Sequence, residues 1–302
     1  MKAIYITLIL LLFSCGKEKN ESKEQNLLVF QSDFGLRDGA VAAMKGVATS
    51  VSKNLQIYDL THEITAYNIS EAAYRLNQSA SYWPAGTIFV SIVDPGVGSA
   101  RKSIVMKTKT GHYFVTPDNG TLTLIAESMG IDGVREIDEA VNRRKGSEAS
   151  YTFHGRDVYA YTGARLASGT ITFEEVGKPL GGDIVRLTNM VADVNGDEIV
   201  GNIPVLDVQY GNVWTNVDKI ALDKIGVKSG DSIEVTITFK GERKYKTVLP
   251  FTTTFAAVPV GSELAYMNSL LQLSFAINQG NFAATHGISQ GENWTVNVKR
   301  EK

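Results

Sequence analysis

Residues 87–98 read Thr-Ile-Phe-Val-Ser-Ile-Val-Asp-Pro-Gly-Val-Gly. The first seven residues form an almost continuous apolar run, which is typical of a buried strand. Asp94 follows directly, and Gly96 and Gly98 allow backbone amides to approach a ligand closely. Open α/β sheets bind ligands beyond the carboxyl ends of their strands. The stretch therefore predicts a buried strand with a polar site at its end.

Strand and helix patterns alternate on both sides of this stretch. The order of strand, helix, strand, helix and strand is typical of a mainly parallel sheet with helices on both faces. We therefore predict an α/β N-terminal domain over residues 27–180, with Ser70 as a candidate N-cap. The expected strands are 27–30, 55–60 and 87–93, with an antiparallel pair at 103–107 and 112–115, and the expected helices are 38–51, 70–82, 119–129 and 156–167.

The pattern changes after Lys178-Pro179-Leu180-Gly181-Gly182. Beyond this break, alternating runs are joined by Asn195-Gly196 and Lys240-Gly241, and such dipeptides between alternating runs are typical of hairpins. We predict a small antiparallel β domain, closed as a barrel, over residues 183–302. Its expected strands are 184–188, 190–194, 198–208, 231–239 and 243–250.

The N-terminal residues differ from the rest of the chain. Lys2 precedes an apolar run over 3–13 and then Ser14-Cys15-Gly16, a pattern typical of a secretory signal. The tetrapeptide ending at Cys15 resembles a bacterial lipobox, in which the cysteine is acylated. Cys15 is the single cysteine of the chain, which favours lipid attachment over a disulfide. A plain signal or a buried N-terminal helix is the alternative.

These features predict a signal peptide at 1–14 and a charged, lipidated tether at 15–26. The protein would then be a lipoprotein of the bacterial cell envelope, anchored through its N-terminal lipid on the periplasmic side or at the surface. Beyond the N-terminus, no run of 18 apolar residues predicts a membrane-spanning helix.

Composition and missing motifs exclude several classes. The net charge of −2 argues against nucleic acid as the main partner, because phosphate binding needs a concentrated basic patch. The chain has no G-x-G-x-x-G fingerprint, no Walker phosphate loop, no G-x-S-x-G elbow and no H-E-x-x-H helix. We therefore expect no nicotinamide cofactor and no metal site.

Three ionisable residues are the candidates for chemistry. Asp94 and Arg101 belong to the first glycine-containing segment, and His154 lies in a second one, Phe153-His154-Gly155-Arg156-Asp157. If they converge, a carboxylate, a guanidinium and an imidazole could hold and polarise a water molecule. Each residue also has an ordinary explanation when taken singly, as a turn aspartate, a surface arginine or a half-buried histidine.

Two further groups could bind a ligand. Asp33 follows the first predicted strand, where a carboxylate can accept hydrogen bonds from ribose hydroxyls. Asp207, Tyr210 and Asn212 end a later strand and could recognise a flat polar ring with an amine nearby. An ordinary strand end with a turn explains the second group equally well.

Taken together, these segments resemble the S-adenosylmethionine hydroxide adenosyltransferases, which are relatives of the fluorinating and chlorinating adenosyl transferases. The resemblance extends from about Leu28 to Val298. The matching segments are Ser32-Asp33-Phe34-Gly35 with Asp38, Lys45-Gly46, Asp59 to Ile64, Val93 to Gly98 with Arg101, Pro117 to Gly120, Phe153 to Asp157, Asp207 to Asn212, and Asn268-Ser269.

The resemblance implies a catalytic set of Asp94, Arg101 and His154 around an attacking water. It also implies a role for each residue that contacts the substrate, without a cofactor or a metal. These roles are the ribose hydroxyls for Asp33, the adenine for Tyr210 and Asn212, the methionine end for Asp207 and Ser269, and the pocket walls for Tyr67 and Phe255. The family further implies a homotrimer, with sites between the N-terminal domain of one subunit and the β domain of the next.

The expected reaction is hydrolysis of S-adenosyl-L-methionine to adenosine and L-methionine by attack of water or hydroxide at the ribose C5′. Asp94, Arg101 and His154 are intact and the 107–112 connection is short, which favours water over halide. A halide-using transferase is one alternative, and a membrane-tethered protein that binds a nucleoside or S-adenosylmethionine without turnover is the other. Leu271 departs from the family, which usually has glycine there.

Overall fold

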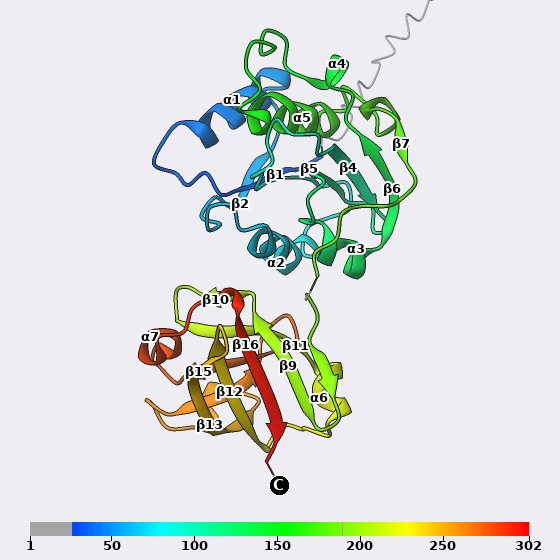
Figure 1. The fold of residues 1–302 in the computed structure, drawn as a ribbon. Coiled ribbons are helices and arrows are strands. Elements are labelled where there is room, and N and C mark those ends of the chain that lie inside the picture. The colour runs from blue at the N-terminus through cyan, green and yellow to red at the C-terminus, as the bar shows by residue number, and fades with distance from the viewer. Residues whose placement is uncertain (1–25, 189, 302) are drawn as a thin grey trace, which may run out of the picture.

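The computed structural model describes residues 26–188 and 190–301, which form two domains (Figure 1). The predicted signal peptide, Cys15 and all but the last residue of the tether lie outside the described residues. Within the described ranges, no helix has the length and apolar character needed to cross a membrane.

The N-terminal domain contains a seven-stranded sheet in the order β2-β1-β3-β5-β4-β6-β7. The first four strands in this order are parallel, and the β5–β4, β4–β6 and β6–β7 pairs are antiparallel. The sheet is therefore mixed, and a mainly parallel sheet is not confirmed. The strands are β1 (Leu28–Ser32), β2 (Ile57–Thr61), β3 (Ile88–Ile92), β4 (Ser103–Thr108), β5 (Tyr113–Pro117), β6 (Ile131–Glu136) and β7 (Pro179–Leu180).

The short connection between β4 and β5 explains why this pair of strands is antiparallel. Only residues 109–112 connect β4 to β5, and a parallel pair needs a crossover of a dozen or more residues. The β4–β5 hairpin was predicted for this reason. Strand β6 then pairs with the free edge of β4, and the sequence pattern had not indicated that strand.

Helices cover both faces of this sheet, as predicted (Figure 1). Val41, Met44 and Ala164 of α1 and α5 pack on one face, and Leu76 and Ile125 of α2 and α3 pack on the other. The helices are α1 (Ala40–Val51), α2 (Ile69–Ala80), α3 (Thr123–Met129), α4 (Glu139–Asn142) and α5 (Tyr161–Ala167), with a π-helical turn at Gly155–Ala160 and a 3-10 turn at Glu174–Val176.

The predicted N-cap of α2 is wrong by two residues. Asn68 caps this helix, since its side-chain oxygen accepts a hydrogen bond of 3.0 Å from the backbone N–H of Glu71. An N-cap side chain bonds to the amide three positions on, and Glu71 occupies that position relative to Asn68. Ser70 lies inside the first turn of the helix instead.

The C-terminal domain is a nine-stranded sheet in the order β10-β11-β15-β14-β13-β12-β16-β9-β8. All its pairs are antiparallel in the described residues except β13–β14. These pairings leave β10 and β8 as outer strands, so closure as a barrel is not confirmed. The strands are β8 (Asp193–Asn195), β9 (Glu198–Ile203), β10 (Val205–Asp207), β11 (Asn212–Asp218), β12 (Ser232–Phe239), β13 (Glu242–Thr252), β14 (Glu263–Met267), β15 (Gln272–Ile277) and β16 (Gly291–Arg300).

Both predicted hairpins form in this domain. Asn195-Gly196 connects β8 to β9, and Lys240-Gly241 connects β12 to β13. The remaining elements are the helices α6 (Lys219–Lys224) and α7 (Phe282–His286) and the 3-10 turn Phe255–Ala257.

The strand expected at 184–188 is not present. Val185 N donates a hydrogen bond of 2.8 Å to Asp118 Oδ1, and Leu187 N donates one of 2.9 Å to Thr123 Oγ1. Side chains of the N-terminal domain therefore satisfy backbone groups that a neighbouring strand would otherwise bind. Hydrophobic alternation alone does not distinguish these two arrangements.

Contacts also join the two domains directly. Arg75 Nη2 of α2 donates a hydrogen bond of 2.7 Å to the carbonyl of Leu206 in β10, and the Tyr74 hydroxyl donates one to Gln272 Oε1. Tyr74 also packs with Val205 and Trp214 in a small apolar cluster. Helix α2 is therefore one of the elements of the N-terminal domain that contact the β domain.

Candidate active site

A cavity of about 300 Å³ lies beyond the carboxyl ends of the adjacent parallel strands β1 and β3. Four of the residues selected from the sequence line it: Asp33, Tyr67, Asp94 and His154. Its other lining residues are Phe34, Ala66, Ile92, Val97, Thr152, Phe153 and Gly155. The lining comes entirely from the N-terminal domain, as expected for ligands at the strand ends of an open α/β sheet.

Asp94 forms a two-point ion pair with Arg101, which does not itself line the cavity. Arg101 Nε donates a hydrogen bond of 2.8 Å to Asp94 Oδ1, and Nη2 donates to Oδ2. The side chains are only 12% and 7% exposed, so little water competes for the pair. Burial alone would lower the pKa of Arg101, but its hydrogen bonds to Asp94 raise that pKa overall. The guanidinium therefore stays charged beside the carboxylate.

Gly96 and Gly98 allow the backbone to adopt the turn that brings Arg101 to Asp94. A Cβ added to Gly96 would lie 3.4 Å from Arg101 Cγ and 3.3 Å from Ser99 Oγ, both tight contacts. Gly98 has a φ of 78°, a left-handed conformation that costs other residues free energy. The chain can thus turn back after Asp94 and return Arg101 to its carboxylate.

Ser103 and Tyr159 form further contacts with the Arg101 guanidinium. Arg101 Nη1 donates a hydrogen bond of 3.0 Å to Ser103 Oγ, which lies 3.1 Å from the Tyr159 hydroxyl. The Arg101 guanidinium carbon also lies 5.6 Å from the centre of the Tyr159 ring. Burial raises the pKa of Tyr159, so its phenol is neutral. The sequence had not pointed to either supporting residue.

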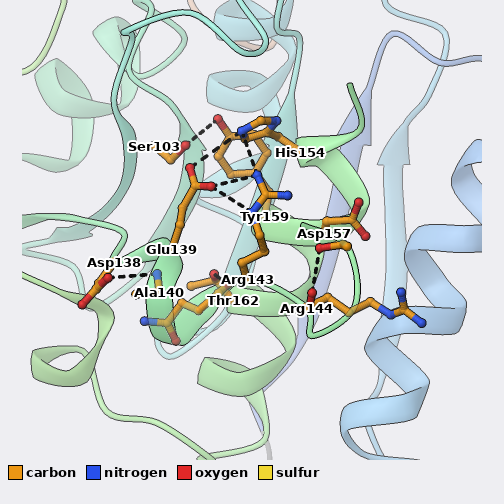
Figure 2. A network of polar contacts seen from close by, with 12 residues as sticks. Ser103, Asp138, Glu139, Ala140, Arg143, Arg144, His154, Asp157, Tyr159 and Thr162 are labelled. Atoms are coloured by element: carbon orange, nitrogen blue, oxygen red, sulfur yellow. Dashed lines mark hydrogen bonds and ion pairs between the residues drawn. The ribbon is translucent and has the colours of Figure 1, made fainter. Parts of the chain in front are cut away.

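His154 lies at the start of the π-helical turn and is 5% exposed. Its Nε2 lies 3.2 Å from Arg143 Nη2 and 3.7 Å from Glu139 Oε1 (Figure 2). Its Nδ1 is buried and has no hydrogen-bond partner among the described residues. Burial lowers the pKa of His154; Glu139 opposes this shift, and Arg101 and Arg143 add to it. The imidazole is therefore held in its neutral form.

Sequence reasoning missed Glu139 and Arg143. They lie four residues apart, and Arg143 donates hydrogen bonds of 3.1 and 2.8 Å from Nε and Nη2 to Glu139 Oε2. That spacing could have predicted a helical ion pair. Nothing in the sequence indicated that the pair would meet His154.

Asp33 and Tyr67, which both line the cavity, are joined by a hydrogen bond. Tyr67 N donates a hydrogen bond of 2.8 Å to Asp33 Oδ2, and Tyr67 has a φ of 69°. Its side chain is 72% exposed. Since a non-glycine residue in this conformation costs free energy, the bond to Asp33 helps to hold the exposed ring where it lines the cavity.

The candidates from the β domain do not line this cavity. Asn212 Nδ2 donates a hydrogen bond of 3.1 Å to Asp207 Oδ2, and Tyr210 projects from the turn between them. Phe255 packs against Tyr266, with ring centres 4.8 Å apart. The structure thus places the selected residues in two groups, one in each domain. Ser269 is exposed in the turn between β14 and β15.

The departure at Leu271 has a backbone consequence. Leu271 has a φ of 56° and its side chain is 62% exposed. Glycine adopts this conformation without the steric cost that a leucine incurs. A glycine would therefore suit the position, and Asn268 Oδ1 holds the turn by accepting hydrogen bonds from the amides of Leu270 and Gln272.

No group of three or more His, Cys, Asp or Glu side chains in the described part of the chain has the arrangement of a metal site. The ionisable residues that line the cavity are Asp94, which is paired with Arg101, the neutral His154 and Asp33. This set can orient a water molecule and bind hydroxyl groups.

Comparisons with known proteins agree on one family. The models described as the SAM hydroxide adenosyltransferase N-terminal and C-terminal domains match residues 28–177 and 201–295. A Methanocaldococcus jannaschii protein named (R)-S-adenosyl-L-methionine hydrolase is 38% identical, over 71% of this chain and 74% of its own length. A Nocardia brasiliensis protein named fluorinase is 28% identical, over 90% of this chain and 97% of its own.

A solved structure supports the same relationship. The crystal structure of a conserved protein from Thermotoga maritima is similar with a TM-score of 0.82 and 31% sequence identity. The similarity covers 91% of this chain and 100% of that protein. Both domains and their connection are therefore shared.

Proposed function

Because this chain belongs to the SAM hydroxide adenosyltransferase family, we propose that it hydrolyses S-adenosyl-L-methionine to adenosine and L-methionine. The observation that carries the proposal is the cavity in which Asp94 and His154 meet, with Arg101 fixed on Asp94. The hydrolase relative is named for the (R) sulfonium epimer, so this epimer is the first substrate to test.

The chemistry follows from the charges. The oxygen of a water molecule bonds to the ribose C5′, the C5′–S bond breaks, and its electron pair returns to sulfur. The sulfonium thus becomes the neutral thioether of methionine, and one proton leaves the attacking water. A cavity that excludes bulk water favours a step in which hydroxide character and the sulfonium charge cancel. Placing the water in line with the sulfur supplies a further part of the rate.

The catalytic residues would divide this work. The charged Arg101 stabilises negative charge that develops on the water oxygen, and Asp94 and His154 orient the water and manage its proton. General acid–base groups of this kind contribute about 10²–10⁴-fold. No cofactor enters the step, since S-adenosylmethionine itself carries the leaving group.

Water is favoured over halide as the nucleophile. The Asp94–Arg101 ion pair places charged groups beside the cavity. The Asp94 carboxylate of this pair can accept a proton there. Residues 109–112 make a tight connection between β4 and β5, without an inserted loop. A halide needs no proton acceptor, so this carboxylate would have no role in halide transfer.

We further propose that the substrate lies between subunits of a homotrimer. Asp33 would bind the ribose hydroxyls and Tyr67 would form a wall of the N-terminal half. The β domain of the next subunit would supply Tyr210 and Asn212 for the adenine, Asp207 and Ser269 for the methionine end, and Phe255 as a second wall. The exposure of Tyr67 and Tyr210 in the single chain supports this arrangement, because each ring would be covered by a neighbour.

Two structural expectations belong to the same proposal. The β domain closes as a barrel, which is supported by the approach of β9 to β11: a Cβ on Gly201 would lie 2.8 Å from Val217 Cγ2. The mature chain is lipidated at Cys15 and held at the cell envelope by residues 15–26. Mass spectrometry of the mature N-terminus would test the lipid directly.

Turnover in ¹⁸O-labelled water tests the function. Purified protein comprising residues 26–302 is incubated with the (R) and (S) epimers of S-adenosyl-L-methionine, and the products are separated by chromatography. We expect ¹⁸O in the 5′-hydroxyl of adenosine, and no adenosine from Asp94→Ala or His154→Ala. Tight binding without product would favour the binding protein instead. A 5′-halogenated nucleoside formed in chloride or fluoride would favour the halide-using transferase.

A further inference from the structure

The contact between Arg143 and His154 restricts where the imidazole can carry its proton. Arg143 Nη2 lies within hydrogen-bond distance of His154 Nε2, at 3.2 Å. A guanidinium only donates hydrogen bonds, so Nε2 must accept and cannot carry a proton itself. Glu139 Oε1, the competing acceptor, lies at 3.7 Å, which is too far for a hydrogen bond.

Arg143 is itself held firmly in place. Glu139 accepts two hydrogen bonds from it, and its guanidinium carbon lies 4.5 Å from the centre of the Tyr151 ring. Glu139 is the first residue of α4, where Asp138 provides the N-cap by accepting a 3.0 Å hydrogen bond from Ala140 N (Figure 2). Glu139 and Tyr151 thus hold Arg143 in place, so it presents Nη2 to the histidine without losing further side-chain entropy.

We propose that Arg143 is a positioning residue that fixes His154 as the neutral tautomer with its proton on Nδ1, so that His154 donates a hydrogen bond to the attacking water. This inference rests on the proposed hydrolysis and assigns the proton in it. Nδ1 is buried, unpartnered among the described residues, and belongs to a side chain that lines the cavity. A ligand oxygen in the cavity is the partner that this N–H lacks.

The assignment divides the work of the two catalytic side chains. His154 has no free lone pair in this tautomer, so it orients the water and does not remove its proton. Each carboxylate oxygen of Asp94 keeps a lone pair beyond the one used by Arg101. As the oxygen bonds to C5′ and the electron pair of the C5′–S bond goes to sulfur, the proton passes from the water to Asp94.

The charges around His154 support the neutral form. Arg101 and Arg143 disfavour a positive imidazole, Glu139 and Asp94 favour one, and burial disfavours it most strongly. Asp94 and Arg101 lie on the connection between β3 and β4, Glu139 is the first residue of α4, and Arg143 follows α4 directly. Protonation at Nε2 would also direct an N–H at the Arg143 guanidinium, so it requires the two side chains to separate.

Ring ¹⁵N spectra of the ligand-free protein test the tautomer. The chain has four histidines, and His154→Gln identifies the signals of interest by their loss. We expect His154 to show a protonated Nδ1 and an unprotonated Nε2 at neutral pH. In Arg143→Met we expect this preference to be lost and His154 to titrate at higher pH, with Arg143→Lys restoring part of the wild-type behaviour.

Arg165→Met is the matched control. Arg165 also anchors α4, through 2.8 Å and 2.6 Å hydrogen bonds to Val141 O and Asn142 Oδ1, but it does not contact His154. This variant should leave the His154 titration unchanged. A proton on Nε2 in the wild type, or the same titration in wild type and Arg143→Met, overturns the proposal.

Kinetics provide a second readout. For Arg143→Met we expect kcat to fall by about 10²-fold, with the acid limb of kcat/KM displaced to higher pH and KM little changed. A pH profile that keeps its wild-type position contradicts the assignment. The spectra are recorded without substrate, so absence of hydrolysis by the wild type would reject the proposed function and leave the tautomer result standing.

Discussion

Arg101 donates hydrogen bonds to both carboxylate oxygens of Asp94, and the two side chains meet at the carboxyl end of β3. The pair is directional as well as charged, because a guanidinium matches a carboxylate at two points. A lysine in place of the arginine would keep the charge and lose this match. The geometry of the pair can therefore be tested separately from its charge.

Arg101→Lys should lower kcat by about 10²-fold with a small effect on KM, since the two-point contact that orients the Asp94 carboxylate is lost. Arg156→Lys is the matched control, because Arg156 makes the same two-point contact with Asp157 at 2.7 Å and 2.7 Å. The carboxylate that Arg156 binds, Asp157, does not line the cavity, whereas Asp94 does. Steady-state adenosine release by both variants measures the difference, and equal losses would show that the effect comes from general destabilisation.

The pH dependence follows from the lowered pKa of His154. Burial is the largest cause, and it moves the pKa below the ordinary value of 6.5. Because protonation at Nε2 would break the contact with Arg143 that positions His154, kcat/KM should persist below pH 6.5 and fall only as the pH approaches the lowered pKa. A profile that falls through pH 6.5 or above would contradict a buried neutral His154.

The lowered pKa of His154 also makes the stability of the folded protein depend on pH. The unfolded chain binds a proton on this imidazole more readily than the folded chain, so the free energy of unfolding should decrease as pH falls below 6.5. His154→Gln cannot titrate, and its unfolding free energy should depend less on pH over this interval. Denaturant unfolding at several pH values measures the unfolding free energy of the wild type and of His154→Gln.

The sequence predicted the strand ends better than the elements that support them. An apolar run followed by Asp94 placed the carboxylate at the end of β3, and both glycine turns of the β domain identified true hairpins. These signals are local, since a buried strand and an Asn-Gly turn each occupy a few consecutive residues. Arg101 and His154 were placed by resemblance, because neither has a local signature.

The support for His154 could not be predicted from the sequence. Glu139 begins a helix of four residues and Arg143 is its C-cap, and such a helix is too short to leave a periodic pattern. Their contact with His154 depends on how α4 packs beside the π-helical turn, which is a tertiary relationship. The strand expected at 184–188 failed for a related reason, because side chains of Asp118 and Thr123 bind its backbone.

The packing of α5 against β3 can be used to test how precisely Asp94 must be positioned. Gly163 of α5 faces β3, and a Cβ there would lie 2.4 Å from Val90 Cγ2. Gly163→Ala should therefore destabilise the protein by about 1–3 kcal/mol and displace the strand that carries Asp94. Gly46→Ala in α1 is the control, since no atom lies within 4 Å of its added Cβ and helix propensity favours alanine by about 1 kcal/mol.

Denaturant unfolding and kcat, measured on both glycine variants, separate packing from propensity. We expect lower stability and lower kcat for Gly163→Ala, and unchanged kcat for Gly46→Ala. Equal stabilities for the two variants would show that α5 and β3 can separate at little cost, and the precise placement of Asp94 would then need another source.

The separation of the candidate residues into two groups predicts complementation between subunits. Asp94 lines the cavity of the N-terminal domain, whereas Asp207 bonds to Asn212 in the β domain. If a site combines one domain from each of two subunits, Asp94→Ala and Asp207→Ala each inactivate a different half. Some sites of a mixed trimer then contain two intact halves.

Equal amounts of the two variants, coexpressed with different affinity tags and purified through both, should recover activity. For random assembly before the tag selection, about a quarter of the sites combine an intact N-terminal half with an intact β half. Each variant alone and a mixture of separately purified homotrimers serve as controls, and both should be inactive. Inactive mixed oligomers would place each site within one subunit. In that case the β domain would have to close over the cavity of its own chain, and its contacts with Tyr74 and Arg75 of α2 would have to break.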